Sequence, residues 1–334
     1  MGMSVDFRVY PWQAQALATL SGAAARERLG HAWLLHGPAG LGKRRLAETL
    51  GAALVCGLPA RHWQESLPAS LETAEPPEVL LPDLHRLTPA PDKQSIGVDQ
   101  VRALIEQFGY TSHGGGARVA IVSLAEQMTV SAANSLLKTL EEPPPEAYLL
   151  LVSHVPGRLP ATLRSRCQRI AVKPPPRESA LAWLAGVEPA RDWARLLGLA
   201  GGSPLLAVSY AAKDMDRRDE EWSQGLAEML TRGGDLPAAV DGWLKEDAPV
   251  FLAWLEGRIE AALRAMAGVP DAGTQDGPGR ALGEALASRP ASALFSLRDG
   301  IRRLRRLADG GVNLSLGLEA QLAGWQRTPA LRRV

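Results

Sequence analysis

The stretch that decides the fold is AWLLHGPAGLGKR, residues 32–44. Its first five residues form a short apolar run that ends at a glycine, which predicts a buried parallel strand. The loop that follows keeps the P-loop spacing of a glycine, four residues and then Gly-Lys. Lys43 to Val55 predicts an amphipathic helix, because Leu46, Leu50 and Leu54 share one helical face. A strand, a glycine-rich loop and a helix in this order predict a site for a nucleotide phosphate.

The loop keeps the parts that bind phosphate and lacks one that holds magnesium. Glycines let backbone N–H groups point at phosphate oxygens, and the lysine neutralises their charge. The position after the lysine should be Ser or Thr, whose hydroxyl holds Mg²⁺, but it is an arginine. The candidate nucleotide-binding residues are Gly37, Gly40, Gly42, Lys43 and Arg44. Two interpretations stay open: the loop binds a nucleotide, or it survives only as architecture.

The acidic residues that ATP hydrolysis needs are also missing. A second buried strand is expected at Val119–Ser123, and an ATPase would carry Asp-Glu at its end. Ser123 and Leu124 stand there instead, and Glu126 comes three residues too late to replace an acid at position 123. Electrostatic stabilisation is usually the largest catalytic contribution, so its loss predicts no intrinsic ATP hydrolysis.

Composition places the chain among ordinary soluble globular proteins. Its 334 residues are 46% hydrophobic and 22% charged, enough for two or three domains. The net charge of +1 argues against strong DNA binding by this chain alone. Cys56 and Cys167 fit a reducing compartment without disulfides. No apolar run is long enough for a membrane span, and Met1–Val9 lacks a secretory apolar core, so a cytoplasmic location is expected.

Strands alternating with helices predict an α/β domain with a parallel sheet, followed by helices. Further strands are expected near Val79–Leu81 and at Tyr148–Val152, and helices at Val98–Phe108 and from a Ser131 cap to Leu140. Pro174-Pro175-Pro176 is a stiff break that marks the first domain boundary. The predicted domains are an α/β P-loop domain at 1–174, a small helical domain at 175–212 and an all-α domain at 213–334.

Two groups in the helical part are interpreted as structural. The tryptophans at helical spacing are expected to pack between helices, and the arginine cluster is expected to be a solvated face or a subunit contact. They are Trp222, Trp243, Trp254 and Trp325, and residues 302–306.

The tripeptide Ser165-Arg166-Cys167 follows a strand and a short helix that starts at Pro160. An arginine near a helix end is usually a surface charge or a carbonyl cap. Its planar, permanently charged guanidinium also suits a neighbour's γ-phosphate, as an arginine finger acting in trans. Cys167 has no His and Asn pattern around it, so a nucleophilic role is not expected.

Residues 134–144, NSLLKTLEEPP, followed by Ser165-Arg166-Cys167, resemble the clamp-loader branch of the AAA+ proteins. Within that branch the chain is most similar to a non-hydrolysing subunit of the bacterial DNA polymerase III clamp loader. The resemblance covers the whole chain, most strongly residues 8–205. Shorter matches are Tyr10-Pro11-Trp12, Ile96-Gly97-Val98-Asp99 and Ser203-Pro204.

The resemblance implies an AAA+ P-loop domain, a small helical lid and a helical collar that joins five subunits into a ring. It implies that Arg166, with Ser165 beside it, completes the ATP site of an adjacent motor subunit. The implied partners are the gamma/tau motor subunits and the delta subunit, with the sliding clamp and primed DNA reached through the complex. The family's lid arginine would fall near Leu205, and it is absent.

No cofactor is required by this interpretation, although ATP or ADP can bind without hydrolysis. Many relatives carry a four-cysteine zinc module after the first P-loop helix. Here only Cys56 remains, and His62 and His85 alone do not make a site, so no zinc is expected.

Two other functions are alternatives: an active AAA+ motor subunit and a free-standing nucleotide sensor or adaptor. Arg44, Ser123 and Leu124 argue against the motor, and the long helical third domain favours assembly. His154 could contact a phosphate or be a loop histidine without a role. Residues 141–142, both glutamates, are expected to fix an interface or the following strand rather than to act as catalytic carboxylates.

Overall fold

The computed structural model describes residues 9–63, 81–90, 93, 95–109, 116–269, 277–308 and 312–328. The chain forms two compact units. The first comprises Met1–Arg191 and Ser203–Leu206, and the second comprises Asp192–Gly202 and Ala207–Val334. The three domains expected from the sequence, with boundaries at 174 and 212, stay a prediction.

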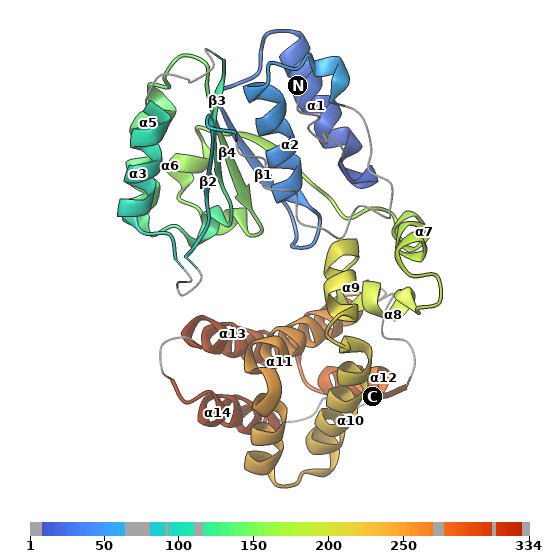
Figure 1. The fold of residues 1–334 in the computed structure, drawn as a ribbon. Coiled ribbons are helices and arrows are strands. Elements are labelled where there is room, and N and C mark those ends of the chain that lie inside the picture. Colours follow the sequence, from blue (N-terminus) through green and yellow to red (C-terminus); the bar gives the residue numbers. More distant parts are fainter. Residues whose placement is uncertain are drawn as a thin grey trace. The chain divides into compact units, whose positions relative to one another are not determined.

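The first unit is built on a five-stranded parallel sheet (Figure 1). Its order is β2-β3-β4-β1-β5, so β1, which leads into the glycine loop, lies between β4 and β5. The strands are β1 (Ala32–His36), β2 (Leu84–Leu87), β3 (Arg118–Val122), β4 (Ala147–Ser153) and β5 (Gln168–Ala171). The central strands are buried on both faces, as parallel strands covered by helices must be. The predicted α/β fold with a parallel sheet is confirmed.

Helices cover both faces of the sheet (Figure 1). On one face α1 (Ala14–Ala25) and α2 (Lys43–Val55) pack against Trp33 and Leu35 of β1. Leu34 of β1 points to the other face. The helices on that other face are α3 (Val98–Gly109), α4 (Val130–Ser135), α5 (Leu137–Glu141) and α6 (Ala161–Arg164). Short 3-10 turns η1 (Pro11–Gln13), η2 (Ala60–His62), η4 (Ala125–Gln127) and η5 (Pro156–Arg158), and helix α7 (Arg177–Val187), complete the described elements of this unit.

The expected strands and helices are confirmed where the pattern is strongly apolar. β1 and α2 have the predicted bounds, and β3, β4 and α3 differ by a residue or two at their ends. Of the strand expected near Val79–Leu81, Val79 and Leu80 lie outside the described residues, and the strand of this region begins at Leu84. β5 was not predicted, because Ile170 is its one buried residue and the pattern is that of a polar loop.

The helix predicted from a Ser131 cap to Leu140 is wrong in two details. It consists of α4 and α5, separated at Leu136, and its cap is Thr129. The Thr129 hydroxyl accepts a hydrogen bond from the Ala132 N–H at 3.2 Å, which satisfies an amide of the first turn. The end of α5 at Glu141, shortly before the prolines, agrees with the prediction.

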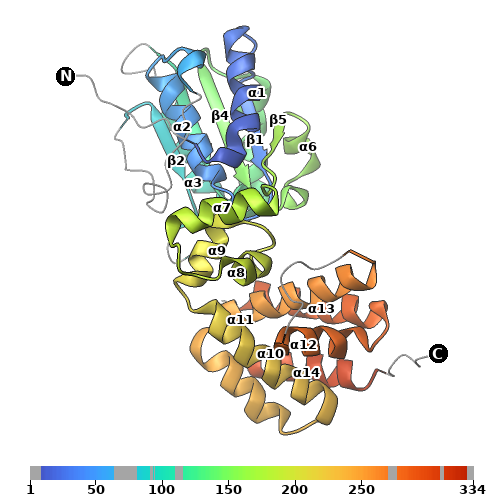
Figure 2. The same ribbon diagram turned by 90° about the vertical axis from the view of Figure 1, so that its right-hand side faces the viewer.

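The second unit is all-helical in its described residues, as expected (Figure 2). α10 packs against α12, and the long α11 packs against α12, α13 and α14. α11 bends at Asp247, whose backbone leaves the helical region and whose carboxylate accepts the Val250 N–H at 3.1 Å. The elements are α8 (Trp193–Leu199), α9 (Pro204–Ala211, whose first residues belong to the first unit), α10 (Met215–Arg232), α11 (Leu236–Met266), α12 (Gly277–Ala287), α13 (Ala291–Leu307) and α14 (Leu314–Gln326).

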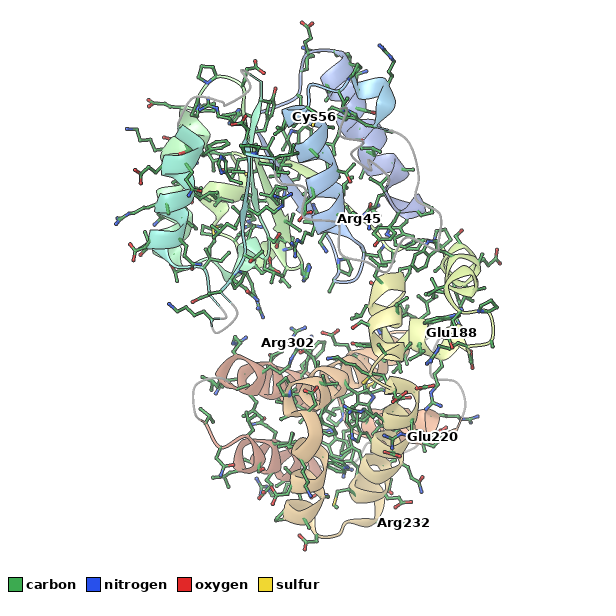
Figure 3. All side chains as sticks on the ribbon, viewed as in Figure 1. Arg45, Cys56, Glu188, Glu220, Arg232 and Arg302 are labelled. Carbon is green, nitrogen blue, oxygen red and sulfur yellow. The ribbon has the colours of Figure 1, made fainter. Side chains whose placement is uncertain are left out.

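The tryptophans and arginines of this unit have structural partners. Trp222, Trp254 and Trp325 are buried, as predicted for helix packing. Arg302 of α13, labelled in Figure 3, pairs with Glu256 and Glu260 of α11. Part of the arginine cluster is therefore neutralised within the chain rather than presented as a continuous basic face. None of the helices in the described ranges is both long and apolar enough to cross a membrane.

Candidate functional site

The glycine loop lies where a doubly wound sheet places its ligands. From β1 the chain crosses one face through α2 toward β2, whereas from β4 it crosses the opposite face through α6 toward β5. The crevice at the carboxyl ends of β1 and β4 is therefore the topological switch point. There His36 of β1 is paired with Ser153 of β4, and Gly37 begins the loop.

The three candidate glycines are required by the loop's geometry. Gly37, Gly40 and Gly42 have φ values of 145°, 73° and 71°. A Cβ on Gly40 would lie 2.4 Å from the Cβ of Leu206, and one on Gly42 would lie 2.4 Å from the Tyr10 ring. Gly42 also forms the N-cap of α2, so the amide groups of the first helical turn remain available to an anion.

Neighbouring segments fix the loop from outside. The Leu41 carbonyl accepts hydrogen bonds from Trp12 Nε1 at 3.0 Å and from Gln13 Nε2 at 2.7 Å. The Leu205 N–H donates to the Gly40 carbonyl at 3.1 Å. Position 205, where the family's lid arginine was expected to fall, therefore lies against the loop and carries an apolar side chain without a charge for phosphate.

Lys43 is a buried cation that its surroundings do not neutralise fully. Its Nζ donates to the Pro38 carbonyl at 2.5 Å, within the same loop. Burial lowers the pKa of Lys43 to about 8, and the carboxylate of Glu126 opposes this shift. An anion placed at the loop would stabilise the charged form of the lysine.

Glu126, three residues too late in the sequence to replace an acid at position 123, nevertheless reaches this site. Leu124 has a left-handed backbone with φ of 54°, and the turn η4 carries Glu126 back toward β4. Its Oε1 accepts the His154 N–H at 2.9 Å, while Oε2 is buried and has no hydrogen-bond partner among the described residues. Burial lowers the pKa of His154, with Lys43 acting in the same direction and Glu126 against it. Lys43, Glu126 and His154 thus form one electrostatic group.

Arg44 does not replace the P-loop hydroxyl that would hold Mg²⁺. Its Nε donates to Oε1 of Glu48, one helical turn along α2, at 2.9 Å. A guanidinium is a cation and cannot coordinate Mg²⁺ as the expected Ser or Thr hydroxyl would. Ser123, at the end of β3, is buried and carries no charge.

Arg166 follows α6 and is exposed on the surface of the first unit. Its Nε and Nη2 donate to Oε1 of Glu141 at 2.9 Å and 2.6 Å, and its Nη1 donates to the Thr162 carbonyl at 3.0 Å. The hydroxyl of Ser165 donates to the same Thr162 carbonyl at 3.0 Å. Ser165 therefore caps the end of α6, and Arg166 is oriented by one carboxylate and one carbonyl.

The structure does not bring Arg166 together with the glycine loop. Arg166 precedes β5 and Glu141 precedes β4, so both lie at the amino ends of the strands, whereas the loop follows the carboxyl end of β1. The seven residues of β4 span the sheet between these edges, roughly 20 Å at about 3.3 Å per residue. Arg166 therefore cannot act on a phosphate held by its own loop.

The two cysteines lie in different surroundings. Burial raises the pKa of Cys167 to about 11, so the thiol stays protonated, the opposite of what a nucleophile needs. Cys56 is exposed at the end of α2 (Figure 3). The described residues contain no group of three His, Cys, Asp or Glu side chains placed to hold a metal ion. Since residues 64–80 lie outside that description, the absence of zinc stays a prediction.

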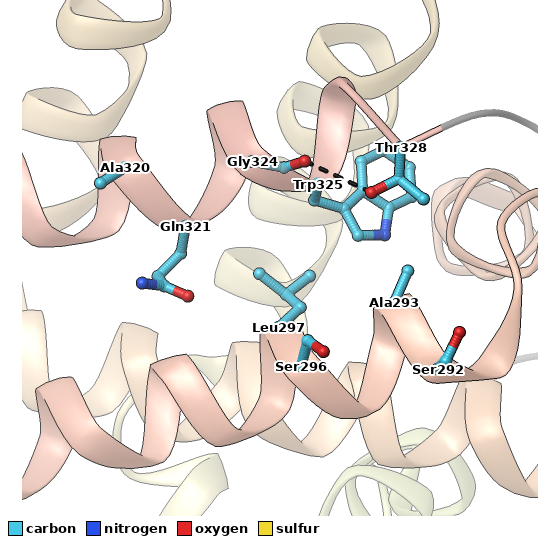
Figure 4. A pocket seen from close by; sticks show the side chains of 9 residues that line it. All are labelled: Ser292, Ala293, Ser296, Leu297, Ala320, Gln321, Gly324, Trp325 and Thr328. Atoms are coloured by element: carbon cyan, nitrogen blue, oxygen red, sulfur yellow. Dashed lines mark hydrogen bonds between the residues drawn. The ribbon is translucent and has the colours of Figure 1, made fainter.

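A groove between α13 and α14 was not singled out from the sequence (Figure 4). Its volume is about 320 Å³, and it is lined by small and polar residues with Trp325 at one end. None of the described residues that line it carries a charge, so they are poorly suited to bind a nucleotide phosphate. The lining residues are Ser292, Ala293, Ser296, Leu297, Ala320, Gln321, Gly324, Trp325 and Thr328.

A doubly wound P-loop unit followed by a helical unit has the architecture expected of an AAA+ protein. The family model described as "DNA polymerase III, delta subunit" matches residues 12–176. DNA polymerase III subunit delta' of Pseudomonas aeruginosa is 33% identical over 96% of this chain and 98% of its own length. The Escherichia coli subunit delta' is 34% identical over 81% of each chain. This chain therefore belongs to the family of DNA polymerase III delta' subunits, and the predicted clamp-loader resemblance is confirmed.

Among solved structures, a DNA polymerase III gamma subunit-related protein from Thermotoga maritima is similar, at 19% identity and a TM-score of 0.45. The match covers 92% of this chain and 99% of that protein.

Proposed function

We propose that this chain is a non-hydrolysing stator subunit of a DNA polymerase III clamp loader, and that Arg166 completes the ATP site of a neighbouring subunit. The observation that carries the proposal is the placement of Arg166. It is exposed, oriented by Glu141 and Thr162, and separated from its own glycine loop by the length of the sheet. A phosphate that Arg166 contacts must then come from another molecule.

An active motor subunit is the weaker alternative. The loop lacks a magnesium hydroxyl because Arg44 occupies that position, and the end of β3 carries Ser123 and Leu124. Glu126 reaches the site, but it holds the His154 backbone rather than taking the place of an acid directly after β3. We expect the isolated chain to show no ATP turnover, measured as phosphate release with and without primed DNA.

The proposed partners are the gamma/tau motor subunits and the delta subunit, with the sliding clamp and primed DNA contacted through the complex in the cytoplasm. The helical second unit is the proposed collar, whose assembly with sister subunits should give a discrete complex on gel filtration.

The decisive test is clamp loading onto primed DNA by a loader reconstituted with the wild-type chain or with Arg166→Ala. Normal loading by an assembled mutant loader would reduce this chain's role to scaffolding.

We also propose that the loop binds ATP or ADP without hydrolysing it. Gly37, Gly40 and Gly42 have the positive φ values that support a phosphate-binding loop, and Lys43 lies at the start of α2 with a lowered pKa that an anion would restore. Glu126 and His154 stand beside it. The loss of hydrolytic groups therefore does not remove the groups that hold a nucleotide.

Nucleotide affinity should fall as the pH rises above about 8. Because the pKa of Lys43 is about 8 in the free chain, the lysine loses its proton above that pH. Binding of a phosphate must then be accompanied by uptake of a proton. One linked proton predicts a dissociation constant that rises by up to about tenfold per pH unit between pH 8 and 9.5. Titration calorimetry with ADP in two buffers of different ionisation enthalpy would measure the proton uptake. A constant affinity over this range would contradict the proposal.

Lys43→Met tests the same lysine by removing its charge. The variant should abolish nucleotide binding and stabilise the free chain. The folded-state pKa lies below the usual value of about 10.5, so the charged lysine penalises folding below pH 8, and the penalty fades as the pH rises toward 10.5. The shift corresponds to about 3 kcal/mol, less about 1 kcal/mol for the lost bond to Pro38. Urea unfolding should show the first unit more stable by about 2 kcal/mol at pH 7 and less stable by about 1 kcal/mol at pH 10.5, where only the loss of the bond to Pro38 remains.

A further inference from the structure

We propose that Glu141 is a positioning residue that orients Arg166 toward the neighbour's phosphate. The inference rests on the proposed function of Arg166 and adds a residue to it. Glu141 does not touch the reacting atoms; it acts through the guanidinium it holds. The sequence offered no sign of this pairing, because the two residues are 25 positions apart and Glu141 ends a different helix.

The contacts of Arg166 leave two of its five guanidinium donors without a partner among the described residues. An arginine side chain carries five N–H donors in a planar fork. Nε and Nη2 each donate to Glu141, and Nη1 donates to the Thr162 carbonyl, which uses three. One N–H remains on Nη1 and one on Nη2, and both nitrogens can donate to phosphate oxygens. The carboxylate therefore takes the Nε and Nη2 edge of the fork and leaves one donor on each terminal nitrogen for a ligand.

Glu141 is itself held by a rigid support. Leu140, the residue before it, is buried under the sheet, and the Leu140 carbonyl accepts a hydrogen bond from His31 Nε2 at 2.9 Å. Residues 143–145, all prolines, restrict the chain immediately after α5. The Glu141 carboxylate thus starts from a fixed backbone, as an orienting group must.

The pair contributes orientation rather than stability. The side chains of Arg166 and Glu141 are 37% and 52% exposed, and an ion pair so open to water adds little to folding. Holding a long arginine in one direction is nevertheless valuable at a transition state, where a displacement of about 1 Å can cost about 10²-fold in rate. In a competing role, the Glu141 carboxylate holds Arg166 back from the phosphate and offsets its positive charge. The two roles predict rate changes of opposite sign.

The test uses the reconstituted loader with primed DNA and clamp, and compares Glu141→Gln with Glu142→Gln. Glu142 is the exposed neighbour at the next position, so its substitution removes the same charge from the same surface. We expect Glu141→Gln to lower the single-turnover rate of ATP hydrolysis at the borrowed site about tenfold, with little change in the ATP concentration that gives half the maximal rate, and Glu142→Gln to stay within about twofold of wild type. Thermal unfolding of both isolated variants should match wild type.

Combining each variant with Arg166→Ala separates positioning from other effects. If Glu141 acts through Arg166, Glu141→Gln should have no further effect in the Arg166→Ala background. An additive loss, an unchanged rate or a faster rate for Glu141→Gln would each overturn the positioning role. If Arg166→Ala alone leaves turnover and loading unchanged, the proposed function fails, and this inference fails with it.

Discussion

Arg166→Ala is expected to slow ATP hydrolysis at the borrowed site by about 10³-fold, the lower part of the range for arginine fingers. Charge develops on the transferred phosphoryl group, and a permanently charged fork placed against it stabilises that charge in a site from which water is excluded. Single-turnover hydrolysis and clamp loading in the same reconstituted reaction would measure the effect. Steady-state turnover alone understates it, because the other ATP sites do not use this arginine.

Two control variants make this result specific. Arg166→Lys keeps the charge but loses the planar fork, so it should restore only a small part of the rate. Arg158→Ala removes another exposed arginine, from η5 at the carboxyl edge of the sheet, and should load clamps normally. Each variant must form the complete complex on gel filtration. Equal rates for Arg166→Ala and Arg158→Ala would show that Arg166 is a structural surface charge.

The sequence predicts those parts of the fold that are set by residues lying close together along the chain. β1 is a continuous apolar run, α2 repeats leucine on one face, and the loop between them needs glycine at positions with positive φ. Each of these features lies within a few residues, so pattern and spacing predict it. β5 escaped prediction because an edge strand with one buried residue has the pattern of a loop.

The site residues that were missed depend on contacts between distant segments. Glu126 reaches Lys43 and His154 because Leu124 adopts a left-handed backbone, a conformation that a leucine in sequence does not signal. Glu141 meets Arg166 because α5 and α6 end at the same edge of the sheet. The spacing of these residues along the chain does not predict either contact.

Asp219 shows the same limit in the second unit. In the sequence it stands within MDRRDEEW, residues 215–222, a charged run that indicates a solvated helix face. In the structure it is fully buried. Its Oδ1 accepts Trp254 Nε1 at 2.7 Å and pairs with Arg258, and its Oδ2 accepts Arg195 Nη2 at 2.9 Å. One carboxylate thus joins α8, α10 and α11.

Asp219→Ala is expected to destabilise the second unit by about 3–5 kcal/mol. The loss is large because Arg258, 5% exposed, would keep a buried charge without its partner. Trp254 would also lose the acceptor of its indole N–H. Arg195 is 31% exposed and can be rehydrated, so it contributes less. Urea unfolding combined with hydrogen exchange of α10 and α11 would measure the change.

The matched control is Glu220→Ala, at the next position of α10. Glu220 is 57% exposed, and its carboxylate lies 3.6 Å from Arg195, so the variant removes an equal charge and one ion pair from the surface. Its expected cost is below about 1 kcal/mol. The residues that contact Asp219 all belong to the second unit, so unfolding of the first unit should not change in either variant. Similar losses for Asp219→Ala and Glu220→Ala would mean that the buried network contributes no more than a surface pair.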